Sequence, residues 1–132
     1  MKYMLDTNIC IYIIKKHPIQ VLTKLKKKSI SDVCISSITL AELEYGVQKS
    51  ERTAQNALAL AEFLAPLEIV PFDEAAAIEF GKIRSYLEKK GLKIGEYDTM
   101  IAAHARALGS ILVSNNIKEF ERVPELKIEN WV

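Results

Sequence analysis

Six oxygen-bearing side chains follow or flank apolar stretches of this sequence, in positions suited to binding a cation. They are Asp6, Glu42, Asp98, Ser114, Asn116 and Glu119. Carboxylates gathered at one place repel one another, and a divalent cation among them relieves that repulsion. Mg²⁺ binds through a few carboxylates together with water and substrate phosphate, and Mn²⁺ is its usual substitute. The set therefore predicts a magnesium site that can take a phosphate.

Each of these residues also has an ordinary structural role when it is considered alone. Asp6 suits the N-cap of a following helix, and Thr39 with Glu42 fits a capping box. Asp98 suits the first turn of a helix, where the helix dipole favours an anion. Residues 115–116, both asparagine, are typical of a turn. Only their combination at one sheet edge favours the metal site.

The elements that must position these side chains alternate between strands and helices. Short apolar runs predict strands at 2–5, 33–36, 67–70, 111–113 and 126–128, the last at an edge. Helical spacing predicts helices over 7–16, 39–49, 52–65, 73–90 and 98–108, the last with its apolar face at Ile101, Ala105 and Leu108. This alternation indicates one α/β domain over 1–132, with a mainly parallel sheet flanked by helices on both faces. In such sheets, sites form beyond the carboxyl ends of the strands.

Composition narrows the class of protein. The 132 residues are 49% hydrophobic and 27% charged, with a net charge of +1, which is too apolar for a disordered chain. No apolar run approaches the length of a membrane span, and Asp6 interrupts the apolar start that a signal peptide would need. We therefore expect a cytoplasmic protein. Cys10 and Cys34 are expected to be buried thiols, and two scattered histidines are too few for a zinc site.

The small net charge hides an uneven distribution along the chain. Residues 1–28 carry seven lysines against Asp6 alone, a net charge of +6, whereas residues 29–99 have a net charge of −5. The run Lys24–Lys28 is either a solvated face or a contact for the phosphates that flank a cleavage site, which position a nucleic acid without reading its sequence.

Four motifs occur in a fixed order along essentially the whole chain. They are Met4-Leu5-Asp6-Thr7-Asn8, Ser37–Leu43 with Gly46, Tyr97–Ala105, and Leu112–Asn116 with Glu119-Phe120. In this order they resemble the PIN-domain ribonucleases, and most closely the VapC toxins of bacterial type II toxin–antitoxin pairs. The resemblance implies a five-stranded parallel sheet flanked by helices, Mg²⁺-dependent cleavage of RNA, and inhibition by a small antitoxin, VapB.

The resemblance also assigns roles by position. Asp6, Glu42 and Asp98 match the acidic triad of the family, and we expect Asp6 and Asp98 to hold the metal. Asn116 matches a fourth catalytic position that is often Asp, so the site is one negative charge lighter, and Glu119 is the candidate to compensate. Ser114 matches a Thr/Ser position whose hydroxyl holds the site through hydrogen bonds.

The charges suggest how such a site would cut RNA. A metal at Asp6 and Asp98 would offset charge on the phosphate, and its bound water would attack phosphorus in line. Glu42 would orient or deprotonate that water. The products would carry 5′-phosphate and 3′-hydroxyl ends. Relatives of this toxin type are associated with structured RNA, so initiator tRNA, cut in its anticodon loop, is the favoured substrate.

Two other functions fit parts of the sequence. A phosphatase with an aspartyl intermediate also places Asp after a strand, but Asn8 stands where that class has its general acid. A degenerate PIN domain that serves only as a binding module is the second alternative, and the retained acids argue against it. Metal-dependent RNA cleavage, abolished by Asp6→Asn, separates an enzyme from a binding module.

The resemblance further implies several partners. We expect a VapB-type antitoxin, a symmetric homodimer, a toxin–antitoxin hetero-oligomer, operator DNA bound only through the antitoxin, and no membrane. Helices 39–49 and 52–65 are the expected walls of the antitoxin groove. Among the remaining residues, His104 is expected at the surface or an interface, Tyr97 is expected to pack in a loop, with stacking on a base as its alternative role, and Trp131 is expected to anchor the C-terminal tail.

Overall fold

Five short parallel strands form the centre of the molecule. The structure is a computed structural model that describes residues 2–132, and the sheet order is β3-β2-β1-β4-β5. The strands are β1 Tyr3–Leu5, β2 Val33–Ser36, β3 Glu68–Val70, β4 Ile111–Val113 and β5 Lys127–Glu129. All four pairings are parallel. The predicted parallel sheet is confirmed, with strand ends that differ by at most one residue.

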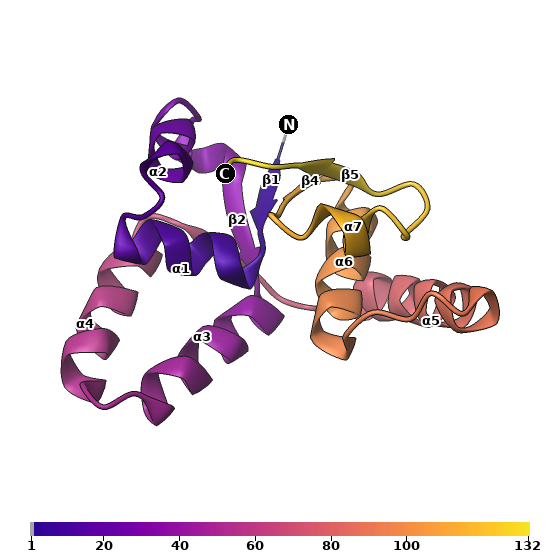
Figure 1. Ribbon diagram of the computed structural model, residues 1–132, viewed down its shortest axis with the longest axis horizontal. Coiled ribbons are helices and arrows are strands. Elements are labelled where there is room, and N and C mark those ends of the chain that lie inside the picture. The colour runs from indigo at the N-terminus through magenta and orange to yellow at the C-terminus, as the bar shows by residue number, and fades with distance from the viewer. Residues whose placement is uncertain (1) are drawn as a thin grey trace.

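The order of the strands sets the location of a site. The chain begins in the central strand, β1, adds β2 and β3 on one side, and then returns to add β4 and β5 on the other (Figure 1). The direction of winding therefore changes between β1 and β4, which pair along their whole length. The crevice beyond the carboxyl ends of strands at such a switch point is where α/β sheets bind ligands.

Helices cover both faces of the sheet, as predicted. They are α1 Thr7–Lys15, α2 Ile19–Lys26, α3 Ser37–Lys49, α4 Thr53–Leu64, α5 Glu74–Lys90, α6 Glu96–Leu108 and the short α7 Ile117–Phe120, with a 3₁₀ turn at Ile30–Asp32. In Figure 1, α1 to α4 lie on one side of the sheet, and α5 and α6 lie on the other. Within residues 2–132, no helix has the length and apolar character needed to cross a membrane.

Two helices were not predicted, because their sequences carry weak helical signals. The lysines of α2 obscure its amphipathic pattern, and only Val21 of that helix is buried. The single turn of α7 is too short to show a period. Two other helices begin two residues earlier than predicted. These are α3, which starts at Ser37, and α6, which starts at Glu96.

The start of α3 corrects the predicted capping box. The Ser36 side chain caps this helix by accepting a hydrogen bond from the backbone N–H of Ile38. Thr39 is therefore already inside the first turn, and Glu42 lies one turn further on. Within the described chain, the buried Thr39 hydroxyl has no hydrogen-bond partner. Thr39 and Glu42 do not form a capping box because the cap position is already taken.

Successive residues of β1 face two separate cores. Met4 belongs to a core shared with α5, α6 and α7, whereas Leu5 belongs to a core shared with α1 to α4. Cys10 and Cys34 are buried free thiols, as predicted. The predicted apolar face of α6 is partly wrong, because Leu108 is 44% exposed at the C-terminal end of the helix while Ile101 is fully buried.

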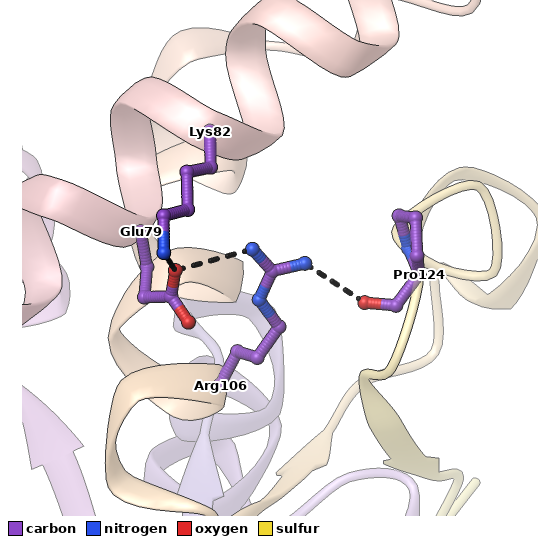
Figure 2. A network of polar contacts seen from close by, with 4 residues as sticks. All are labelled: Glu79, Lys82, Arg106 and Pro124. Carbon is purple, nitrogen blue, oxygen red and sulfur yellow. Dashed lines mark hydrogen bonds and ion pairs between the residues drawn. The ribbon is translucent and has the colours of Figure 1, made fainter.

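An arginine joins three segments at the far end of α6 (Figure 2). Arg106 donates one hydrogen bond to the carbonyl of Pro124 at 3.0 Å and another to Oε2 of Glu79 at 3.3 Å. Lys82 pairs with the same Glu79 oxygen at 3.7 Å. The hydrogen bond from Arg106 is the main cause that lowers the pKa of Glu79. This network fastens α5 and the segment before β5 to α6.

The C-terminal tail is anchored by Trp131, as predicted. Trp131 is 1% exposed, and its ring lies 5.8 Å from the ring of Tyr3, between centroids. Its Nε1 donates a hydrogen bond of 2.7 Å to Glu129. The last residues therefore pack beside the first strand.

Candidate active site

The first acid, Asp6, lies where β1 ends and α1 begins. Its Oδ1 accepts a hydrogen bond of 2.9 Å from the backbone N–H of Ile9, so it caps α1, the ordinary role considered for it. It is also hydrogen-bonded to the hydroxyl of Ser114, which follows β4. That hydroxyl accepts the N–H of Asn116 at 2.9 Å. Asp6 therefore sits at the switch point between β1 and β4, only 4% exposed.

The second acid, Glu42, is brought to this edge by α3. Its side chain is half-buried, and Oε1 accepts a hydrogen bond of 2.6 Å from the hydroxyl of Thr7. Thr7 is the first residue of α1 and directly follows Asp6. The contact fixes the Glu42 carboxylate against the start of α1.

The third acid, Asp98, lies in the first turn of α6, where an anion is favoured. Burial, and then the negative charges of Asp6, Glu42 and Glu119, together raise the pKa of Asp98 to about 6. A Cβ added at Gly95 would lie 3.9 Å from Oδ2 of Asp98, an ordinary van der Waals contact, so this carboxyl does not require a glycine there. Four carboxyl groups from four segments thus act on one another at this edge.

Burial also raises the pKa of Asp6, and the charge of Glu42 adds to that effect. The hydrogen bonds from Ser114 and from the N–H of Ile9 act in the opposite direction. Without a cation, the buried acids resist full ionisation.

The donor set fits a hard divalent cation, because its oxygens are carboxylates whose negative charges are close and poorly compensated. Asp6 and Asp98 remain the predicted ligands of that cation. Among residues 2–132, no three His, Cys, Asp or Glu side chains converge closely enough to enclose a metal ion by themselves. Mg²⁺ tolerates such a site, because it commonly keeps several waters and binds through one or two carboxylates.

Asn116 and Glu119 belong to the segment that follows β4. Asn116 is half-buried at the start of α7, and Glu119 lies on that short helix. Glu119 acts on Asp98 electrostatically, so α7 brings its charge toward the acids. The neighbouring Asn115 has a different environment: it is exposed, and its side chain accepts a hydrogen bond of 3.1 Å from Asn130.

Two predictions about residues of α6 are wrong. His104 is not at the surface but 1% exposed, and its Nδ1 lies 2.8 Å from the hydroxyl oxygen of Ser36. Tyr97 does not pack in a loop, because α6 begins at Glu96 and leaves the Tyr97 side chain 58% exposed. The early start of α6 explains the exposure of Tyr97. The contact with the Ser36 hydroxyl at the end of β2 offsets the cost of burying His104.

An apolar groove of about 400 Å³ lies on the α1–α4 side of the sheet. Its walls include Ile14 of α1, Val47 of α3 and Leu60 of α4, and Glu42 lies along it. The sequence predicted α3 and α4 as walls, and the structure adds α1. The groove therefore leads to one of the acids.

The lysine run at residues 24–28 does not lie beside the acids. Residues 24–28 precede the start of β2, and the Lys28 ammonium lies 4.6 Å from the ring centroid of Tyr3 at the start of β1. The acids, in contrast, follow the carboxyl ends of the strands. Lys24–Lys28 therefore flank the opposite end of the sheet from the site.

Sequence reasoning gave Thr7 no role, although it belongs to the first motif. The available signal was a hydroxyl directly after Asp6, at the end of a buried strand. Its partner is 35 residues away, so the hydrogen bond becomes visible only when α1 and α3 are placed together.

Comparisons of this chain with family models, with curated proteins and with solved structures all point to one family. The family model described as "PIN domain" matches residues 3–126. Ribonuclease VapC2 of Haemophilus influenzae is 50% identical over 132 residues, covering 100% of this chain and 99% of that protein. The tRNA(fMet)-specific endonuclease VapC of Salmonella typhimurium is 45% identical over 131 residues, 99% of this chain and 98% of that protein. The structure of VapBC2 from Rickettsia felis, bound to a DNA fragment from its promoter, contains a chain with a TM-score of 0.93, 49% identity and full coverage of both chains.

Proposed function

Because this chain belongs to the PIN-domain family, and within it to the VapC ribonucleases, we propose that it is the Mg²⁺-dependent endoribonuclease toxin of a VapBC pair. The observation that carries this proposal is the gathering of Asp6, Glu42, Asp98 and Glu119 at one edge of the sheet, where burial first, and then the charges of the other three acids, raise the pKa of Asp98 to about 6. Four uncompensated carboxyl groups at the switch point of a parallel sheet suit a cation and a phosphate.

Different residues have different proposed roles in the cleavage of RNA. Asp6 and Asp98 would hold Mg²⁺, which would supply positive charge to a phosphate oxygen and lower the pKa of a water. Glu42, oriented by Thr7, takes the proton of the attacking water. Ser114 keeps the Asp6 carboxylate in place. The attack breaks the P–O3′ bond and the leaving 3′-oxygen takes up a proton from solvent, so the products end in 5′-phosphate and 3′-hydroxyl.

The proposed substrate is initiator tRNA, cut in its anticodon loop. The support is the 45% identical Salmonella relative, which is named as specific for tRNA(fMet). Sequencing the 5′ ends of RNA fragments after brief expression tests this directly. Cuts concentrated in one loop of initiator tRNA support the proposal, and cuts spread over messenger RNA contradict it.

The proposed partner is a VapB antitoxin, supported by the VapBC complex of Rickettsia felis. An apolar segment of the antitoxin would fill the groove between α1, α3 and α4, which leads to Glu42. An arginine beyond that segment would pair with the acids through its planar fork. We further propose a symmetric toxin dimer, contact with operator DNA through the antitoxin alone, and action in the bacterial cytoplasm, where the substrate is found.

Cleavage by the purified chain tests the proposed enzyme against the non-catalytic alternative. We expect RNA cleavage with Mg²⁺ or Mn²⁺, none in EDTA, and none from Asp6→Asn in either condition. Cleavage that persists in EDTA would contradict the metal dependence. Absence of cleavage by wild type in every metal, with a folded protein that still binds its antitoxin, would favour a binding module.

A further inference from the structure

His104 makes a buried side-chain hydrogen bond that the proposed chemistry does not use. Its Nδ1 lies 2.8 Å from Oγ of Ser36, and the two residues are 68 positions apart. Their exposed fractions are 1% and 0%. His104 belongs to α6, whereas Ser36 ends β2 and caps α3. The bond therefore joins the two helices that carry Asp98 and Glu42.

The donors and acceptors at Ser36 indicate the direction of this bond. The Ser36 oxygen already accepts the backbone N–H of Ile38 at 3.0 Å. If His104 also donated to it, the buried hydroxyl hydrogen would be left without an acceptor among these contacts, which is costly. The arrangement that satisfies the Ser36 hydroxyl has it donating to an unprotonated Nδ1, with the proton of the neutral ring on Nε2. Burial lowers the pKa of His104 and keeps the ring neutral, although Asp73 acts in the opposite direction.

Two contacts of Phe72 add to this junction between α6 and the start of α3. The ring of Phe72 meets the His104 ring edge to face, with centroids 5.5 Å apart at 79°. The backbone N–H of Phe72 donates a hydrogen bond of 3.0 Å to the hydroxyl of Ser37, the first residue of α3. The segment before α5 thus holds the start of α3 against the same face of α6.

The spacing connects this junction to the acids. Ser36 precedes Glu42 by six residues, and His104 follows Asp98 by six, which is about 9 Å along a helix in each case. We propose that His104 is a positioning residue, whose hydrogen bond to Ser36 fixes α3 against α6 and so sets the separation of Glu42 and Asp98. This inference rests on the proposed function, because it assigns His104 a purpose in that same site.

Three variants test the proposal. His104→Leu introduces an apolar side chain of similar size and removes the acceptor, and His104→Asn retains a polar atom near the position of Nδ1. Ser110→Ala is the matched control, because it removes a different buried hydroxyl, the one that donates to the Ala105 carbonyl at 3.2 Å. We expect His104→Leu to lower kcat for RNA at least tenfold with KM within about twofold. His104→Asn should recover most of the loss, and Ser110→Ala should match wild type.

The second readout does not depend on cleavage. Residual dipolar couplings measured by NMR on the metal-free protein report the orientation of α3 relative to α6. We expect a changed orientation in His104→Leu and the wild-type orientation in His104→Asn. An unchanged orientation in His104→Leu, or equal losses of kcat in both His104 variants, would overturn the proposal. If wild type fails to cut RNA, the proposed function fails, and the couplings still decide the positioning role.

A His104→Leu variant that fails to fold would require a second variant. If His104→Leu does not fold, Ser36→Ala removes the other partner of the bond and is measured in the same way. A folded Ser36→Ala with a rotated α3 supports the proposal. If neither variant folds, the bond serves the fold as a whole, and the positioning role is overturned.

Discussion

The hydroxyl of Thr7 donates a hydrogen bond of 2.6 Å to Glu42, so the residue next to one acid orients another. The two come from different helices, α1 and α3, and Thr7 begins its helix immediately after the Asp6 cap. The position of the Glu42 carboxylate relative to Asp6 is thus set by the turn from β1 into α1. The direction of the lone pairs that would receive the proton of water is therefore defined before substrate arrives.

Thr7→Val should slow cleavage without unfolding the protein. The change keeps the shape of the side chain and removes one hydrogen bond to a charged group, a contact worth about 1.5–3 kcal/mol. If about half of this is lost in the transition state, kcat falls on the order of tenfold. Single-turnover cleavage measures it. Thr23→Val, which removes an exposed hydroxyl bonded to the Ile19 carbonyl, is the control and should be unchanged.

Asp6 has a structural and a chemical role that substitutions can separate. Asn caps helices about as well as Asp, so Asp6→Asn should keep the stability of α1 while lowering cleavage at least about a hundredfold. Asp6→Ala should lose both roles, with a further cost of about 1 kcal/mol from the missing cap. Urea unfolding and cleavage assays give the two quantities. Equal stability of the Asn and Ala variants would show that the cap contributes nothing.

The pKa of Asp98 predicts how stability depends on pH without metal. Because the pKa is raised from 3.8 to about 6 in the fold, the folded state binds more protons than the unfolded state between these values. The contribution of Asp98 to the free energy of unfolding therefore falls as pH rises from about 4 to about 6. Asp98→Asn should remove that decline, and in EDTA above pH 6 the variant should melt at the higher temperature. Thermal melts from pH 4 to 7 measure the difference.

Added Mg²⁺ provides the complementary test of Asp98. A cation that binds only the folded protein raises its melting temperature, and it does so more strongly when the carboxylates are intact. We expect a larger Mg²⁺-induced shift in wild type than in Asp98→Asn at pH 7. Identical shifts in the two proteins would place the ion away from Asp98.

The fourth position can be assigned by adding and removing charge. Asn116→Asp should tighten Mn²⁺ binding unless Glu119 already fills that role. Titration of Mn²⁺ in wild type, Asn116→Asp, Glu119→Gln and the double variant separates the two. A gain from Asn116→Asp only in the Glu119→Gln background assigns the position to Glu119. No gain in either background would show that residue 116 does not face the ion.

Arg106 should matter for stability rather than for the site. Arg106→Met keeps an unbranched apolar stem and removes the hydrogen bonds to Glu79 and Pro124. Two hydrogen bonds from a charged donor would be worth about 3–6 kcal/mol if fully buried, and the partial exposure of Arg106 and Glu79 lowers the expected cost to about 2–3 kcal/mol. Urea unfolding measures this cost, and cleavage per folded molecule should be unchanged. Arg84→Met, which removes a more exposed arginine that pairs with Glu88 and Glu96, is the control and should cost less than about 1 kcal/mol.

The sheet could be predicted from the sequence because each strand is a short apolar run between clear helical patterns. Residues that follow strands, such as Asp6 and Ser114, were placed by the same reasoning, since parallel strands share one carboxyl edge. The start of α3 was misplaced, because Ser36 and Thr39 are both good capping residues. Only the three-dimensional register of β2 shows which of them the helix uses.

What the sequence did not give were contacts between segments far apart in the chain. His104 has an apolar neighbour on each side, and nothing local reveals a serine 68 residues earlier as its partner. The bond from Thr7 to Glu42 was missed for the same reason. The lysine run had two possible roles, a solvated face or a contact for phosphates, and its position before β2, at the opposite end of the sheet from the acids, favours the solvated face.

The location of β1 at the centre of the sheet has a consequence for synthesis of the protein. The first strand to leave the ribosome pairs with β4, more than a hundred residues later. Ser114, which holds Asp6, is made later still, and β5 covers the open edge of β4 last. Contacts this distant in sequence form late. A nascent or prematurely terminated chain that lacks β4 therefore has its first acid but no assembled site.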